Sequence, residues 1–340
     1  MKQKTFSSDR LLLDPEQEVE QIGDFMRKVL IKDLRRRGIV LGVSGGIDSA
    51  VTAALAVRCL GKERVHCILM PERESSPDTL TLSRLLVDHL GVDHSLEDIT
   101  ETLHAVGFYR RYQEAVRRVV PEYGTGWGSK LVTTDPIEGG GFTFFSLVVA
   151  DPAGVQKTVR LPIEVYLDIV ATTNFKQRCR KQMEYYYADR LNFAVAGTPN
   201  LLEYDQGFFV KNGDGAADLK PIAHLYKSQV YQLADYLGVP EQIRLRPPTT
   251  DTFSLAQGQD EFFFALPYQK MDLCLYGLNH QIDPAEVGVA VGLQADQVRK
   301  VWANLEQKRS TVRYLHLSPL VLRRLPETQR EEARGTLHAP

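Results

Sequence analysis

The 340-residue sequence lacks several features that would assign it to a protein class at once. Its four cysteines are scattered without a CxxC pair, which argues against a zinc site or a disulfide framework and favours a reducing, cytoplasmic setting. No apolar run approaches the roughly 20 residues that cross a bilayer, and the N-terminal LLL is too short for a secretory signal. With 41 basic and 43 acidic residues, the net charge of −2 favours no nucleic-acid partner. We therefore expect a globular protein that binds neither membranes nor nucleic acid.

Two common nucleotide-binding motifs are also missing, namely the Walker pattern GxxxxGK[ST] and the Rossmann pattern GxGxxG. The sequence does contain a glycine-rich turn, SGGIDS at 44–49, which follows the apolar run IVLGV at 39–43 and precedes a helical pattern. Such a turn directs backbone N–H groups and the positive end of a helix dipole at one point, which suits an anion. The turn is therefore a candidate phosphate loop, although a glycine turn alone can simply connect a strand to a helix.

Strand and helix patterns alternate around this turn. Short apolar runs predict strands, apolar residues at three- and four-residue spacing predict helices, and short loops separate them. This alternation predicts a parallel α/β sheet with right-handed crossovers and a nucleotide at the carboxyl ends of its strands. The predicted strands are 39–43, 65–70 and 192–197, and the predicted helices are 15–36, 50–61, 76–91, 100–120, 163–187 and 225–238.

The middle of the chain departs from this alternation. Segment 141–162 shows strand patterns on both sides of Asp151-Pro152-Ala153-Gly154, so it predicts a β-hairpin. We therefore predict an insertion with a β-hairpin within the α/β core. The predicted organisation is a first part of the α/β domain at 1–106, the insertion at 107–162, the second part of the α/β domain at 163–282, and a helical C-terminal tail at 283–340.

The string SGGxDS after a strand resembles the pyrophosphate loop of the ATP pyrophosphatases, which cleave ATP between its α and β phosphates. Further segments, in this order, resemble the ammonia-dependent NAD⁺ synthase family. The resemblance covers about 15–105 and 170–315 and leaves the predicted insertion unmatched. The segments that carry it are NFKQRCR (174–180), GTPNLLE (197–203), KNGDG (211–215), YKSQV (226–230), RPPTTD (246–251) and QKR (307–309).

The resemblance implies a fold, a reaction and partners. The fold is a doubly wound parallel sheet of the adenine nucleotide α-hydrolase type. The reaction is ATP-dependent adenylation of the carboxylate of nicotinic acid adenine dinucleotide, then amidation by ammonia with release of AMP and pyrophosphate. The resemblance also implies a homodimer, and a carboxylate beside a polyphosphate implies Mg²⁺. The sequence shows no Cys–His nucleophile arrangement and no room for a glutaminase domain, so ammonia is expected to be free or supplied by a separate polypeptide.

Individual residues acquire roles through this resemblance alone. Asp48, Glu203, Lys211 and Lys227 are implied as catalytic residues, with Asp48 and Glu203 as metal ligands. The residues implied to bind ATP are Ser44, Gly45, Gly46, Asp48, Ser49, Arg73, Thr198 and Lys227. The residues implied to bind the acid substrate are Asn174, Arg178, Tyr186, Lys211, Asp214, Asp218, Lys308 and Arg309.

Departures from the family pattern keep an alternative substrate open. GTPNLLE carries Leu201 and Leu202 where polar residues are usual, Gln307 replaces a histidine, and the insertion is unmatched. An amide ligase that acts on a different carboxylic acid is therefore the second hypothesis. The simpler interpretations at individual positions are that Arg178 is a solvated charge on a helix and that Glu203 is a surface carboxylate.

A DNA-binding function is a third hypothesis, because residues 286–309 resemble a helix-turn-helix with Gly292 in the turn. A recognition helix needs several basic residues, and the second helix offers only Arg299 and Lys300 within it. We therefore favour a packed helical tail. A noncatalytic relative is disfavoured, because both Asp48 and Glu203 are present.

Overall fold

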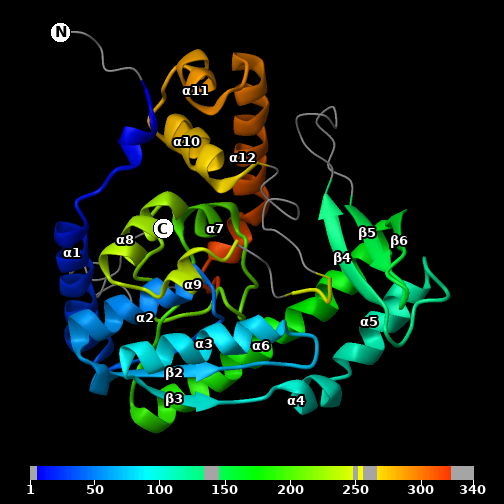
Figure 1. The fold of residues 1–340 in the computed structure, drawn as a ribbon, viewed down its shortest axis with the longest axis horizontal. Coiled ribbons are helices and arrows are strands. Elements are labelled where there is room, and N and C mark those ends of the chain that lie inside the picture. The colour runs from blue at the N-terminus through cyan, green and yellow to red at the C-terminus, as the bar shows by residue number, and fades with distance from the viewer. Residues whose placement is uncertain (1–5, 134–144, 248–251, 256–265, 323–340) are drawn as a thin grey trace.

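A computed structural model describes residues 6–133, 145–247, 252–255 and 266–322. Three predicted features extend beyond this part of the chain. Residues 134–144 of the insertion, 248–251 of RPPTTD and 323–340 of the tail lie outside the described residues. Figure 1 shows an α/β core, with a second, smaller sheet on one side of it and the C-terminal helices at one end.

The core sheet is parallel and has the order β3-β2-β1-β7, as the sequence predicts for an α/β fold. Ile39 of β1 is paired with Val65 of β2 on one side and with Ala194 of β7 on the other. The edge strand β3 was not predicted, because its sequence DHSL is polar and largely exposed and so lacks an apolar run. The strands are β1 (Ile39–Gly42), β2 (Val65–Leu69), β3 (Asp93–Leu96) and β7 (Ala194–Val195).

Helices cover both faces of this sheet, which confirms the doubly wound architecture. One face packs against α1 (Pro15–Lys28), α2 (Ile47–Leu60), α3 (Pro77–Leu90) and α8 (Lys227–Tyr236). The other face packs against α4 (Thr100–Ala105) and the long helix α6 (Ile163–Leu191). Each face therefore has its own apolar cluster, and the strands between them are buried on both sides.

Two predicted helices differ in detail from the observed ones. The helix predicted at 15–36 is α1 followed by a π-helical segment, η2 (Val29–Leu34), which ends at the left-handed Arg35. The helix predicted at 100–120 is two helices, α4 and α5 (Phe108–Arg117). They separate at Gly107, whose φ of 73° lies in the left-handed region that a continuous helix does not use.

The predicted insertion contains a three-stranded antiparallel sheet of order β4-β5-β6. Its strands are β4 (Gly128–Thr133), β5 (Phe145–Ala150) and β6 (Gln156–Arg160), so the predicted hairpin is confirmed and β4 is an additional strand. Leu131, Leu147 and Val149 on its inner face are buried in one cluster with residues of α5 and the start of α6. The sheet is thereby fixed to the core, while the domain boundaries themselves stay a prediction.

The C-terminal helices form a packed group. Gly292, with φ 71°, connects α11 to α12, and Val287, Val298 and Val301 are buried against α10. These buried faces favour a packed helical tail over a DNA-binding module. None of the helices in the described part of the chain is long and apolar enough to cross a membrane. The remaining helices are η1 (Ser8–Leu11), η3 (Lys62–Arg64), α7 (Leu201–Gln206), α9 (Glu241–Arg244), α10 (Tyr268–Asn279), α11 (Pro284–Val291) and α12 (Ala295–His316).

Candidate active site

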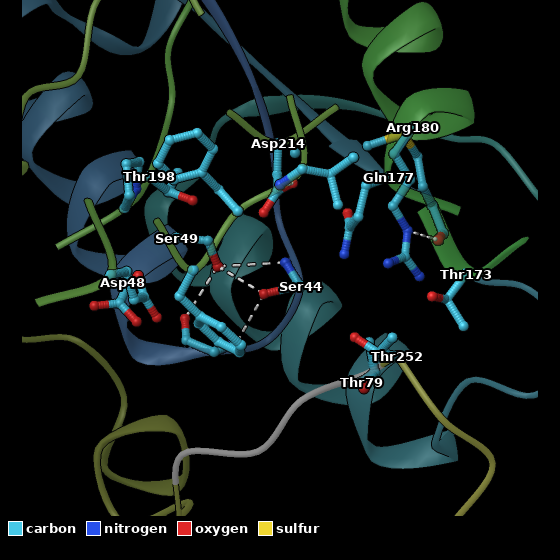
Figure 2. A pocket seen from close by; sticks show the side chains of 18 of the residues that line it. Ser44, Asp48, Ser49, Thr79, Thr173, Gln177, Arg180, Thr198, Asp214 and Thr252 are labelled. Carbon is cyan, nitrogen blue, oxygen red and sulfur yellow. Dashed lines mark hydrogen bonds between the residues drawn. The ribbon is translucent and has the colours of Figure 1, made fainter. Parts of the chain in front are cut away.

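A cavity of about 480 Å³ lies at the carboxyl ends of β1 and β2, where a doubly wound sheet binds nucleotides. Its walls come from the glycine-rich loop, α6, the segment around α7, the loop that follows α9, and the inserted sheet. Figure 2 shows Asp48 on one side of this cavity, with Thr173, Gln177 and Arg180 of α6 on the opposite side. The cavity therefore joins parts of the chain that are far apart in sequence, such as Gly46 and Arg246, which are separated by 200 residues.

The glycine-rich loop has the conformation that an anion site needs. Gly45 adopts φ 69°, and a Cβ there would lie 2.8 Å from the Thr79 carbonyl oxygen, so a side chain is excluded on both counts. The Ser49 hydroxyl donates to the Gly46 carbonyl at 3.0 Å and lies 3.3 Å from the Ser44 hydroxyl. Gly46, the N-cap residue of α2, has no side chain of its own, and its N–H lies 3.4 Å from the Ser44 hydroxyl. The predicted residues Ser44, Gly46 and Ser49 line the cavity, and Gly45 supports them through its backbone.

Asp48 and Lys227 form the charged centre of the cavity. The Lys227 side chain is 2% exposed, and its ammonium forms a salt bridge with Asp48 Oδ2. The Asn200 amide donates to Asp48 Oδ1 at 3.1 Å. Burial alone would lower the pKa of Lys227, but the charges of Asp48 and Glu203 outweigh it and raise that pKa. The ammonium thus stays charged, with two carboxylates acting on it.

Glu203 is positioned by the start of α7. Asn200 caps this helix by accepting from the Glu203 N–H at 3.1 Å, and the Glu203 carboxylate accepts from the Asn200 N–H at 3.2 Å. This reciprocal capping box fixes the Glu203 side chain at the cavity wall, next to Thr198. Glu203 therefore differs from the freely solvated surface carboxylate of the simpler reading.

Asp48 and Glu203 suit a magnesium ion that is shared with a phosphate ligand. Within the described residues, no group of three or more His, Cys, Asp or Glu side chains could hold a metal by itself. Mg²⁺ is typically bound through one or two carboxylates together with substrate phosphates and water, not by an all-protein cage. Two carboxylates beside a phosphate loop match that donor set.

One face of α6 lines the cavity, and sequence reasoning identified only part of it. Thr173, Gln177, Arg180 and Glu184 follow one another at three- and four-residue spacing and all line the cavity. Of the predicted residues on this helix, Asn174 lines it as well. The stripe of polar residues at helical spacing was the signal available in the sequence.

Two other residues predicted on α6 point elsewhere. Arg178 is exposed and donates to the Lys211 carbonyl at 3.4 Å, and Tyr186 is 55% exposed and packs edge-on against Tyr187. Neither residue lines the cavity. Their contact with substrate stays a prediction.

Two buried carboxyl groups lie near each other at one end of the cavity. Asp214 accepts from the Val210 N–H at 2.8 Å, and Glu184 lies 2.5 Å from the Lys181 ammonium. Burial raises the pKa of both carboxyl groups despite these partners. Both carboxyl groups line the cavity.

Three further predicted residues have structural partners outside the cavity wall. Arg73 lies over the Tyr109 ring, 3.7 Å from its centroid, and Asp218 accepts from the Val195 N–H of β7 at 2.7 Å. The Lys211 ammonium donates to the Tyr314 carbonyl at 2.6 Å, near the end of α12. These contacts stabilise the fold around the site, and the ligand roles of all three residues stay predictions.

The last two predicted residues lie on α12, and neither is part of the cavity wall. Arg309 forms a 2.9 Å salt bridge with Asp205 and donates to Asn279 at 2.6 Å, which fixes α12 to α7 and α10. Burial lowers the pKa of Lys308 to about 8. Their predicted role in closing the site is not tested by this arrangement.

Arg246 was missed as a site residue, although its motif was recognised. It lines the cavity beside the phosphate loop, with Nη1 3.4 Å from the Gly45 carbonyl and Nη2 3.2 Å from the Thr79 hydroxyl. Its position depends on a loop remote in sequence. RPPTTD marked the segment in the sequence, but not which of its side chains lies beside the glycine-rich loop.

Comparison with known proteins agrees with the geometry. The NAD synthase family matches residues 18–122 and 154–313, and the unmatched stretch between them falls within the predicted insertion. The chain is 57% identical to the NH(3)-dependent NAD(+) synthetase of Rhizobium meliloti (strain 1021), covering 95% of this chain and 97% of that protein. It is 58% identical to the protein of the same name from Mesorhizobium japonicum, covering 92% of this chain and 98% of the relative.

Solved structures share the fold. The NH3-dependent NAD synthetase of Campylobacter jejuni aligns with a TM-score of 0.60 at 23% identity, over 92% of this chain and 100% of that one. The NMN synthetase of Francisella tularensis aligns with a TM-score of 0.61 at 21% identity, over 91% and 99%. At these identities the likeness concerns the adenine nucleotide α-hydrolase-like fold alone. Together with the family match and the close relatives, it shows that this chain belongs to the NAD synthase family.

Proposed function

We propose that this protein is an ATP-dependent carbon–nitrogen ligase that converts nicotinic acid adenine dinucleotide to NAD⁺ with ammonia as the nitrogen donor. The observation that carries the proposal is the buried Lys227 ammonium between Asp48 and Glu203, beside the phosphate loop and inside the cavity. The close relatives carry the name NH(3)-dependent NAD(+) synthetase, which favours this substrate over the alternative of a different acid.

The reaction has two steps. A carboxylate is a poor electrophile, so one of its oxygens first attacks the α phosphorus of ATP, and the bond to the β-phosphate oxygen breaks to release pyrophosphate. Ammonia then attacks the carbonyl carbon of the acyl adenylate, AMP leaves with the bridging oxygen, and the nitrogen loses a proton. The protein contributes positioning and charge rather than a covalent intermediate of its own.

The phosphate loop and Lys227 act on the first step. The backbone N–H groups at the start of α2 and the Ser44 and Ser49 hydroxyls can bind phosphate oxygens. The Lys227 ammonium, kept charged by its carboxylate neighbours, stabilises the negative charge that develops on the leaving pyrophosphate. Asp48 and Glu203 would hold Mg²⁺, which neutralises polyphosphate charge when bound.

Asp214 and Glu184 suit the second step. Ammonium must lose a proton before its nitrogen can act as a nucleophile. A carboxyl group with a raised pKa accepts a proton at a pH nearer neutrality than an ordinary carboxyl group does. Burial raises the pKa of both groups, and both line the cavity. We assign to this pair the binding of ammonium and the removal of its proton.

The setting of the reaction belongs to the same proposal. The four cysteines are all unpaired, which suits a reducing cytoplasm. Ammonia arrives free or from a separate polypeptide. A homodimer is supported by two apolar side chains one turn apart on α6, Ile163 and Leu167, which are 58% and 55% exposed.

A substrate panel tests the proposal. The protein is incubated with ATP, Mg²⁺, ammonium and one of several carboxylic acids, and AMP, pyrophosphate and amide are measured. We expect equal amounts of all three with nicotinic acid adenine dinucleotide, and no amide and at most one pyrophosphate per protein molecule when ammonium is omitted and glutamine supplied. Amide formation with another acid only would overturn the substrate, and absence of AMP with every acid would overturn the ligase assignment.

A further inference from the structure

We propose that the inserted sheet builds a stacking subsite for a planar nitrogen heteroaromatic ring of a nucleotide substrate, centred on Phe145. The inference deepens the proposed function, because that function supplies two ligands with such rings, ATP and the dinucleotide. The family match leaves residues 123–153 uncovered, so neither β4 nor β5 is assigned a role by it.

The cavity has two chemically different ends. The phosphate loop, Asp48 and Lys227 make one end polar and charged. Apolar and aromatic side chains from four separate segments line another part: Leu131 of β4, Phe145 of β5, Tyr166 and Val170 of α6, and Phe253. A nucleotide has the same division, with charged phosphates at one end and an apolar ring face at the other.

Phe145 occupies a distinct place on its strand. It lies on the same face of β5 as Leu147 and Val149, since side chains two apart share a face. Leu147 and Val149 are fully buried in the cluster under the sheet, whereas Phe145 is only half-buried and lines the cavity. The inner face of the sheet thus passes from core packing at Val149 to the cavity wall at Phe145.

The ring of Phe145 is already held in a stacking geometry. It is stacked on Tyr166, with ring centroids 3.8 Å apart and planes 17° from parallel. Tyr166 begins the α6 stripe that continues through Val170 to Thr173 and Gln177, all of which line the cavity. The stacked pair gives the cavity wall an aromatic platform for a heteroaromatic ring, and Thr173 and Gln177 add hydrogen-bonding groups for other parts of the ligand two and three turns further along the same helix face.

Replacement of the ring by an aliphatic side chain tests the subsite. Phe145→Leu keeps an apolar group and removes the aromatic face, and Phe145→Tyr keeps the face. Dissociation constants for ATP alone and for nicotinic acid adenine dinucleotide alone are measured by calorimetry, with KM and kcat for the full reaction. Stacking of one base on an aromatic side chain corresponds to about a 10- to 100-fold change in affinity. We expect Phe145→Leu to weaken the binding of one nucleotide by that factor with little change in kcat. The Phe145→Tyr variant should bind both nucleotides as the unmodified protein does.

The nucleotide whose binding is weakened identifies the ring that stacks on Phe145. Weaker binding of ATP only assigns the subsite to the adenine of ATP, and weaker binding of the dinucleotide only assigns it to a ring of the acid substrate. Nicotinic acid mononucleotide then separates the pyridine of the acid from its adenine. Any of these outcomes supports the subsite.

Val149→Ala is the matched control, because it truncates a buried side chain on the same face of the same strand away from the cavity. It should lower the melting temperature and leave both dissociation constants unchanged. The subsite is overturned if Phe145→Leu leaves both constants within twofold, or if Val149→Ala weakens binding as much as Phe145→Leu does. Binding is measured without turnover, so a failure to form NAD⁺ would sink the proposed function and leave this comparison valid.

Discussion

At the scale of single residues, the site depends on charges that are buried together. Lys227 cannot lose its proton easily, because Asp48 and Glu203 raise its pKa against the effect of burial. Removal of one member of a buried ion pair leaves the other without compensation, which costs about 3–5 kcal/mol of stability. In the proposed mechanism the same ammonium stabilises developing phosphate charge, and its effects on stability and on rate can be measured separately.

Lys227→Met should lower kcat/KM by roughly 10²- to 10³-fold, the range found when one stabilising group is removed from a transition state. It should also lower the free energy of unfolding, because two carboxylates then face each other without a cation. Addition of Asp48→Asn to that variant removes one of these carboxylates and should recover part of the lost stability, but no activity.

Denaturant unfolding and initial rates measure the two effects on the same preparations. Lys227→Arg, which retains a positive charge, is the control for packing. A double variant no more stable than Lys227→Met alone would contradict the buried pairing.

At the scale of elements, a second buried cluster joins segments that surround the cavity. Lys176 of α6 lies 2.8 Å from Glu72 and 3.2 Å from Glu74, and it donates to the Thr252 carbonyl at 3.1 Å. The Tyr109 hydroxyl of α5 donates to Glu72 at 2.8 Å. Burial alone would raise the pKa of Glu72, but Lys176 lowers it below the ordinary value. One ammonium therefore links α6, the segment after β2 and the segment that carries Thr252.

Lys176→Met should destabilise the protein by about 3–5 kcal/mol, because Glu72 is fully buried and loses its counter-ion. Lys157→Met is the matched control, since Lys157 pairs with Glu122 at 3.4 Å at the surface, where a pair contributes about 0–1 kcal/mol. Chemical denaturation of both variants gives the comparison. Equal losses of stability in the two variants would show that the buried ion pair contributes no more to stability than the surface pair does.

Asp272 gives the fold a pH dependence. It accepts from the N–H and the hydroxyl of Ser228 at 2.7 and 2.6 Å, which joins α10 to the start of α8 next to Lys227. Burial raises the pKa of Asp272 to about 6 from its ordinary 3.8. Between these two values the folded protein retains a proton that the unfolded chain has lost. This group therefore makes stability fall as pH rises from about 4 to about 6, by on the order of 3 kcal/mol.

Asp272→Asn keeps an acceptor for Ser228 and removes the charge. Its free energy of unfolding should exceed that of the unmodified protein at pH 7–8, and the difference should shrink towards pH 4. Urea denaturation at several pH values tests this, and a difference independent of pH would refute the assignment to Asp272.

Much of the core and the phosphate loop could be predicted from sequence, because both depend on neighbours in the chain. Apolar runs predicted β1 and β2, and SGGIDS predicted the loop between β1 and α2. The rest needed tertiary information. The edge strand β3 is too polar to show a pattern, Gly107 divides a helix at one residue, and which face of α6 meets the cavity is decided by packing. For that reason Arg178 was predicted and Gln177 and Arg180 were missed.

At the scale of the whole molecule, the exposed Ile163 and Leu167 make α6 a candidate contact between two copies of the chain. Sedimentation should give twice the mass of one chain. Joint substitution of Ile163 and Leu167 by aspartate should halve that mass, because charges do not pack in an apolar interface. The exposed Leu12→Asp is a control that should leave the mass unchanged. A single-chain mass for the unmodified protein would rule out the dimer.

In the proposed function the whole assembly activates a carboxylate by adenylation, with the phosphate loop and the Asp48–Lys227 pair at the centre of the site. Nicotinic acid adenine dinucleotide with oxygen-18 at both carboxylate oxygens distinguishes this activation from others, when it is converted with ATP and ammonia and the products are analysed by mass spectrometry. We expect one oxygen-18 atom in the phosphate of AMP for each NAD⁺ formed, and none in pyrophosphate. Oxygen-18 in inorganic phosphate, with ADP as the second product, would contradict adenylation.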